Sequence, residues 1–154
     1  MSDPAADLQR FHTAQGGGEG SAYARAIGEL QTGAKRTHWI WFVLPQLRGL
    51  GRSAQAERYG ITDLAEARAY LADPLLRERL ETVIALISEP LQHSEQNLPT
   101  LMGSELDAAK TISSLTLFEA AGLASATPLL DLLGQRCQQT LIRLQASPSP
   151  ADAP

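Results

Sequence analysis

Apolar residues recur at intervals of three and four along most of this 154-residue chain, which is the pattern of helices that bury one face. The clearest stripe has five members at helical spacing: Leu76, Leu80, Val83, Ile84 and Ile87. We expect this helix to end near Pro90, because proline lacks the N–H that would continue the hydrogen-bond ladder. Periodicity of this kind over most of a chain predicts an all-α fold.

Capping residues suggest where further helices begin. Thr62 or Asp63 is expected to cap a helix that stops before Pro74. Ser104, with Asp107 three residues later, resembles a capping box and predicts a helix that runs to about Ala121. The last helix is expected over residues 129–144, with Gly134 as a candidate break. With two shorter patterns near the N-terminus, the sequence predicts about six or seven helices.

Residues 39–44, with the sequence WIWFVL, do not fit this pattern. Six apolar residues in a row, several of them aromatic or β-branched, would suit a buried strand. A strand needs a partner, and the chain offers no convincing second one. We therefore expect a short buried helix that enters a glycine-rich irregular loop.

Composition limits the classes of protein to which the chain can belong. Hydrophobic residues make up 44% and charged residues 19%, with a formal net charge of −4, which indicates a globular domain and not a nucleic-acid-binding one. The prediction is one domain over residues 7–145, with a flexible segment 1–6 and a disordered proline-rich tail 146–154. The sequence shows no signal peptide and no membrane span, so we expect a cytoplasmic protein.

A disulfide or metal centre is not expected. Cys137 is the only cysteine, so no intramolecular disulfide can form, and its leucine neighbours suggest a small buried or half-buried thiol. His12 and His93 have no second ligand at metal-binding spacing. The sequence therefore predicts no metal and no cofactor.

Residues 35–52 are the basic part of an acidic chain, since no acid lies between Glu29 and Glu57. Glycines close to arginines can expose backbone N–H groups beside guanidinium groups, which are elements of a phosphate or carboxylate site. A glycine-rich corner with solvated arginines is the alternative. The candidate ligand-binding residues of this stretch are Lys35, Trp39, Gln46, Arg48, Arg52 and Ser53.

The aromatic residues and His38 of this stretch have competing interpretations. Trp39, Trp41 and Phe42 fit a buried core better than a ligand platform, although Trp39 could form the wall of a pocket. His38 is a weak candidate for an acid or base, because cationic neighbours would favour its neutral form.

A second polar group lies in residues 105–118. On a helix, Asp107, Lys110 and Ser114 fall on one stripe, and hydroxyl groups in so apolar a segment need hydrogen-bond partners from the protein or from a ligand. A surface pair of Asp107 and Lys110 is the alternative. No nucleophile–base–orienter triad can be assigned from spacing.

Both stretches resemble the family called domain of unknown function 1810, and the likeness covers residues 8–144. It rests on Lys35, Thr37-His38-Trp39, Trp41-Phe42, Pro45-Gln46, Gly49-Leu50-Gly51, Ser53, Asp107, Lys110, Ser113-Ser114 and Thr116-Leu117-Phe118. Thr37, Leu44 and Cys137 stand where the family usually has serine, phenylalanine and aspartate. The resemblance implies a mainly α-helical fold and brings no established activity.

The residues support two functional hypotheses. In the first, the two polar stretches converge and bind an anionic, phosphate-bearing small molecule such as a nucleotide or an ADP-ribose-like compound, with hydrolase or transferase chemistry left open. In the second, the chain is a non-catalytic helical module that binds another protein. Whether the protein is an enzyme is left undecided by the residues.

Overall fold

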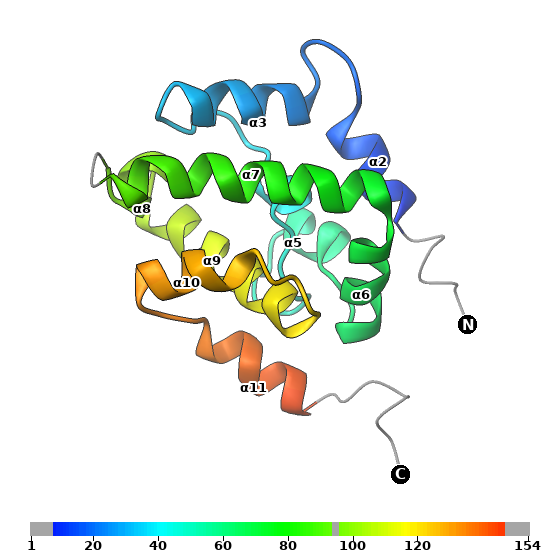
Figure 1. Ribbon diagram of the computed structural model, residues 1–154. Coiled ribbons are helices and arrows are strands. Elements are labelled where there is room, and N and C mark those ends of the chain that lie inside the picture. Colours follow the sequence, from blue (N-terminus) through cyan, green and yellow to red (C-terminus); the bar gives the residue numbers. More distant parts are fainter. Residues whose placement is uncertain (1–7, 94–95, 147–154) are drawn as a thin grey trace.

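A long helix, α7 (Pro74–Gln92), crosses the molecule, with α3 (Ala22–Gln31) packed on one side of it and α10 (Ala126–Leu133) on the other (Figure 1). The computed structural model describes residues 8–93 and 96–146. The remaining helices are α2 (Gln9–Gln15), α4 (Ile40–Val43), α5 (Ala54–Tyr59), α6 (Leu64–Ala72), α8 (Leu98–Met102), α9 (Glu105–Ala120) and α11 (Gln138–Ala146). Of the segments 1–6 and 146–154, expected to be flexible or disordered, only Ala146 is described, as the last residue of α11. Residues 1–6 and 147–154 lie outside the described residues.

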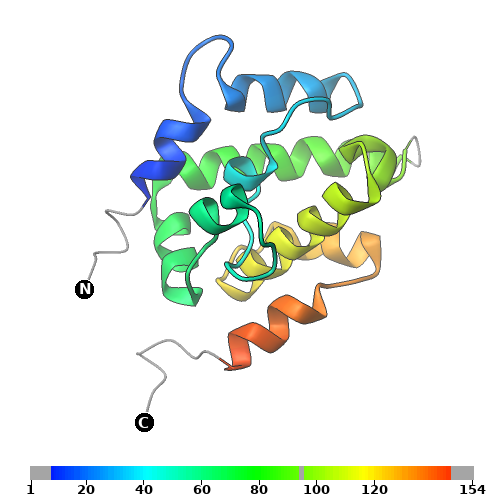
Figure 2. The ribbon, with the colours of Figure 1, turned by 180° about the vertical axis from the view of Figure 1, so that it is seen from behind.

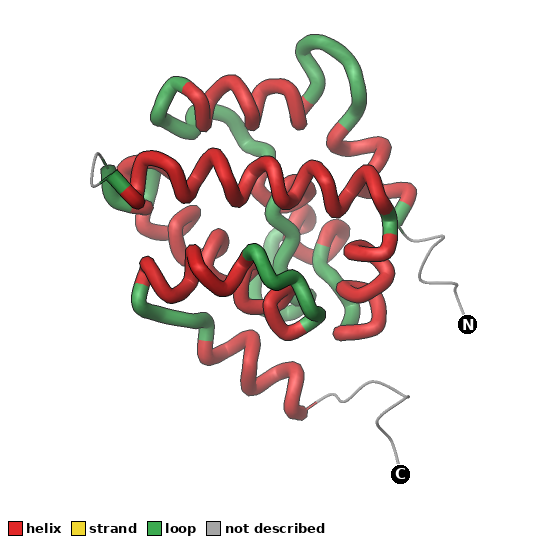
Figure 3. Tube along the Cα trace, viewed as in Figure 1, coloured by secondary structure: helices red, strands yellow, loops and turns green. Residues whose placement is uncertain are grey.

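The described residues contain ten helices and no strand, so the prediction of an all-α fold is confirmed and the count of six or seven is wrong (Figure 3). Three of the helices, α4, α5 and α8, are only four to six residues long and carry too few apolar positions for a visible stripe. Gly134, in a left-handed conformation at φ +71°, ends α10 and separates it from α11. No described helix is long and apolar enough to cross a membrane.

Side-chain caps explain where several helices begin. The Oγ of Ser104 accepts a hydrogen bond from the Asp107 N–H, and Asp63, not Thr62, caps α6. The expected end of α7 near Pro90 is confirmed, since the helix ends at Gln92, two residues later. Pro90 lies in the last turn, where the loss of one ladder hydrogen bond costs less than in the middle of a helix.

The core is built around α9. All eight residues 111–118 are buried, because α4, α6, α8, α10 and α11 all pack on this helix. Three of its hydroxyl-bearing residues have protein partners: Thr111 and Thr116 donate to the carbonyls four residues earlier, and Ser113 bonds Thr140. The segment 111–118, buried on every side in this way, is a core element, whereas the first turns of α9 reach the surface.

Residues 39–44 form the expected short helix. Ile40–Val43 is α4, which buries Ile40 and Val43, while Trp39 just before it has no exposed surface. The alternative of a strand is therefore wrong, and the described residues contain one isolated bridge, between Leu47 and Ile61.

The loop between α3 and α4 is held by the carboxylate of Glu29. It accepts hydrogen bonds from the N–H groups of Arg36 and Thr37, from Thr37 Oγ1 at 2.6 Å and from Trp39 Nε1 at 3.0 Å. Burial alone would raise the pKa of Glu29, but these hydrogen bonds outweigh it and lower the pKa from 4.5 to about 2. Glu29 thus holds the segment that leads into α4.

We expect Glu29→Gln to lower the free energy of unfolding by about 2–3 kcal/mol at pH 7, because an amide cannot accept from all four donors. The ionised carboxylate stabilises the fold fully above its unfolded pKa of 4.5 and loses this effect as the pH falls towards about 2. Urea unfolding at pH 7, 4 and 2.5 should therefore show the difference from wild type shrinking with acid. Glu19→Gln, in an exposed loop, is the control, and a difference that stays constant with pH would contradict this role.

Candidate functional site

The chain contains two lysines, and both approach the carboxylate of Asp107. Lys35 Nζ, from the loop after α3, lies 2.8 Å from Asp107 Oδ2. Lys110 Nζ, one turn further along α9, lies 3.7 Å from Oδ1. The structure thus brings together three of the predicted site residues. Two cations share one anion, so the group carries a net positive charge in a protein of net charge −4.

The two lysines differ in how fully the protein occupies them. The side chain of Lys35 is only 5% exposed, and its Nζ also donates to the Thr37 carbonyl at 2.8 Å. The side chain of Lys110 is 20% exposed, and its contact with Asp107 is longer than a hydrogen bond. Its Nζ lies 5.0 Å from the centroid of the Trp41 ring, a cation–π distance. Lys35 therefore has two short contacts for its three N–H donors, whereas none of the described contacts of Lys110 is within hydrogen-bond distance.

Two buried polar atoms close to Lys110 in the fold lack a partner in residues 8–93 and 96–146. They are Trp41 Nε1 and Ser114 Oγ. Ser114 has no exposed surface and lies one helical turn beyond Lys110 on the same face of α9. Trp41 belongs to α4, which packs against α9. We call Trp41, Lys110 and Ser114 the donor cluster, because each carries a polar hydrogen without a firm acceptor.

Trp39 and His38 occupy different environments. The indole N–H of Trp39 donates to Glu29, and Lys35 Nζ lies 5.1 Å from the Trp39 ring centroid. The ring of Trp39 is therefore buried and lies against Lys35. His38 is exposed, and its ring centroid lies 6.3 Å from that of Trp41 with the planes inclined by 33°. His38 therefore borders the donor cluster from the solvent side.

The other predicted site residues belong to a separate group of contacts. Arg48 Nε donates to the Glu57 carbonyl at 3.1 Å, and Ser53 caps α5 by accepting from the Ala56 N–H. Gln46 is half-buried, and Arg52 is exposed. None of the hydrogen bonds or ion pairs described for these four residues reaches Lys35, Asp107 or Lys110. The structure therefore does not join the arginines and the lysines in one contact network.

The segment between α4 and α5 that carries Arg48 lies beside α11 (Figure 2). Gly49 has φ +99°, and a Cβ there would come within 2.7 Å of Arg143 Nη1. Arg48 and Arg143 line a hollow of about 170 Å³ with Asp63. This small polar hollow has a carboxylate beside its two guanidinium groups, which lowers its attraction for an anion.

Trp41 is the member of the donor cluster that was not predicted as a site residue. It lies in the apolar run 39–44, which favours a place in the core. Its side chain is only partly buried, whereas Trp39, a predicted site residue, is completely covered.

In the described part of the chain, no group of three or more His, Cys, Asp or Glu residues could hold a metal ion.

Comparison with known proteins identifies relatives of nearly the whole chain. The model of the family described as "Protein of unknown function (DUF1810)" matches residues 5–144. The crystal structure of the conserved hypothetical protein Rv1873 from Mycobacterium tuberculosis superposes with a TM-score of 0.80 at 39% sequence identity, covering 94% of this chain and all of that one. No curated protein matches. A match of this extent, on a chain that carries the motif residues at Lys35, Asp107 and Lys110, means that the protein belongs to the DUF1810 family.

Proposed function

We propose that this protein binds an anionic, phosphate-bearing small molecule at the donor cluster. The observation that carries the proposal is the buried indole N–H of Trp41, which has no partner in the described part of the chain. An indole nitrogen is a donor only, so the group that completes it must be an acceptor. Leaving such a donor buried and unpaired costs about 1–3 kcal/mol, which a ligand oxygen would recover.

Charge supports an anion over a neutral acceptor. Asp107 already neutralises Lys35 at 2.8 Å, so the charge of Lys110, at 3.7 Å, is the one left for a ligand. Phosphate oxygens accept hydrogen bonds from ammonium, hydroxyl and indole N–H groups, and these are the three donors of the cluster. Lys35 and Asp107 then serve to position Lys110 and not to touch the ligand directly.

The class of ligand we propose is a nucleotide or an ADP-ribose-like compound. The exposed ring of His38, inclined to that of Trp41, offers an aromatic edge where the base or ribose of such a ligand would rest. If the site carries out hydrolase or transferase chemistry, His38 is the acid or base that we assign to it. The four residues Gln46, Arg48, Arg52 and Ser53 are not needed for this minimal site.

A helical protein-interaction module is the second proposal. Leu106, on the first turn of α9, is 65% exposed. Its neighbour Glu105 lines a hollow of about 240 Å³ whose other lining residues are largely apolar, including Leu98, Ala109 and Ile112. An apolar hollow at the surface is a feature of sites that bind other proteins, whereas a single exposed leucine is common on any protein surface. On this view the donor cluster is completed by water alone.

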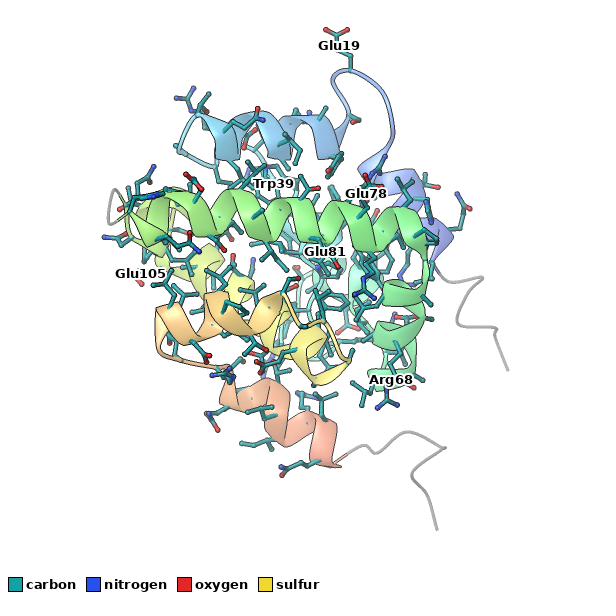
Figure 4. The ribbon with its side chains drawn as sticks, viewed as in Figure 1. Glu19, Trp39, Arg68, Glu78, Glu81 and Glu105 are labelled. Atoms are coloured by element: carbon teal, nitrogen blue, oxygen red, sulfur yellow. The ribbon has the colours of Figure 1, made fainter. Side chains whose placement is uncertain are left out.

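Lys110→Ala should weaken the binding of ADP-ribose, AMP or inorganic phosphate at least tenfold, because it removes the charge left for the ligand. Isothermal titration of the full chain with each compound measures this. Arg68→Ala on α6 is the control, since it removes an exposed positive charge elsewhere (Figure 4). Failure of all three compounds to bind the wild type, or equal binding by the Lys110 and Arg68 variants, would refute the proposed site.

Ser114→Ala should leave the free energy of unfolding unchanged or raise it by about 1 kcal/mol, because it removes a buried hydroxyl that has no partner in the described residues. The same change should weaken ligand binding. Ser113→Ala is the matched control, since Ser113 bonds Thr140 at 3.1 Å and its loss should destabilise the protein without changing affinity. If the two variants behave alike in urea unfolding and in titration, Ser114 has no role in binding.

A further inference from the structure

A third hollow, separate from the two already described, lies where α3 and α7 end. It has a volume of about 380 Å³ and is lined by Leu30, Gln31, Thr32, Gly33, Leu86, Glu89, Pro90 and Gln96. The last turns of both helices lie on the same side of the molecule (Figure 1). None of these residues belongs to the donor cluster, so a ligand of this hollow would be independent of the function proposed for that cluster.

The unpaired atom in this hollow is an acceptor. Gln96 Nε2 donates to the Gly33 carbonyl at 2.8 Å, while Gln96 Oε1 is buried and has no partner in the described residues. The amide cannot simply be turned over, because its oxygen would then face another oxygen at Gly33. Gly33 has φ +88°, and a Cβ there would come within 2.6 Å of Gln96 Nε2, so the glycine permits this close approach.

Other groups around the hollow are also acceptors. In an α-helix, the N–H of residue 90 would donate to the Leu86 carbonyl. Pro90 has no N–H, so the Leu86 carbonyl lacks this hydrogen bond within α7. Glu89 adds an exposed carboxylate, which lies 3.6 Å from His93 Nδ1. The C-terminal ends of α3 and α7 add partial negative charge. A cationic donor would satisfy these groups, whereas an anion would be repelled.

The floor of the hollow is apolar. Leu30 is only 3% exposed, and Leu86 and the Pro90 ring line the hollow with it. A methylene chain would pack on these side chains while its charged end met the acceptors. From this combination we propose that the hollow binds a small aliphatic primary amine, with the ammonium group donating to Gln96 Oε1 and to the Leu86 carbonyl.

Butylammonium is the probe, and 1-butanol is its uncharged analogue of similar size. In NMR titrations of the full chain at pH 8, butylammonium should shift the Gly33 backbone amide and the Gln96 side-chain amide along a saturating curve. Butanol should give shifts at least tenfold weaker at equal concentration. Equal responses to the two compounds, or shifts that grow linearly without saturation, would overturn the proposal.

Two variants separate binding from folding. Pro90→Ala restores an N–H to the Leu86 carbonyl, so it should weaken butylammonium binding severalfold while the protein stays at least as stable to heat. Glu89→Gln should weaken binding about two- to fivefold, and Glu78→Gln, an exposed acid near the start of the same helix, should not (Figure 4). Unchanged affinity in Pro90→Ala, or equal losses in the two glutamate variants, would show that the acceptors do not hold the amine.

Discussion

The burial of the second half of α9 is the constraint on which the rest of the structure depends. Eight consecutive buried residues require neighbours on every side, and α4, α6, α8, α10 and α11 provide them. A helix so enclosed has to satisfy each hydroxyl from within the protein. Thr116 does so twice, donating to the Ile112 carbonyl and accepting from the Cys137 N–H, which also fixes the start of α11. Ser114 is the hydroxyl of these eight residues that the described contacts leave without a partner.

The same helix begins with charge and ends with ion pairs. Asp107, in its first turn, forms an ion pair with Lys35. The loop after α3 is therefore held by the Glu29 carboxylate at one point and by α9 at another. At the other end, hydrogen bonds from Arg136 lower the pKa of Glu119, and burial opposes them. Buried charges are tolerated where each has a partner. The polar contacts therefore fix how α9 is placed along its axis, while the apolar residues fix which elements surround it.

The sequence predicted the long elements and the caps better than the short ones. Ser104 and the stripe from Leu76 to Ile87 located α9 and α7, because a cap and a repeated spacing are local properties. A four-residue helix such as α4 has no repeat to detect, and its helical state depends on the elements that pack against it. Lys35, Asp107 and Lys110 meet in the fold, whereas Arg48 donates to the Glu57 carbonyl in a different part of it. Nothing in the sequence distinguishes the covered Trp39 from the partly exposed Trp41, because that difference arises only from tertiary packing.

The contact between Lys35 and Asp107 has a consequence for folding kinetics. It joins residues far apart in the chain, so every helix from α4 to α8 lies within the loop that it closes. Contacts of such long sequence separation form late, because the entropy of closing the loop is lost before the contact contributes. During synthesis the contact between Lys35 and Asp107 cannot form until the start of α9 has left the ribosome.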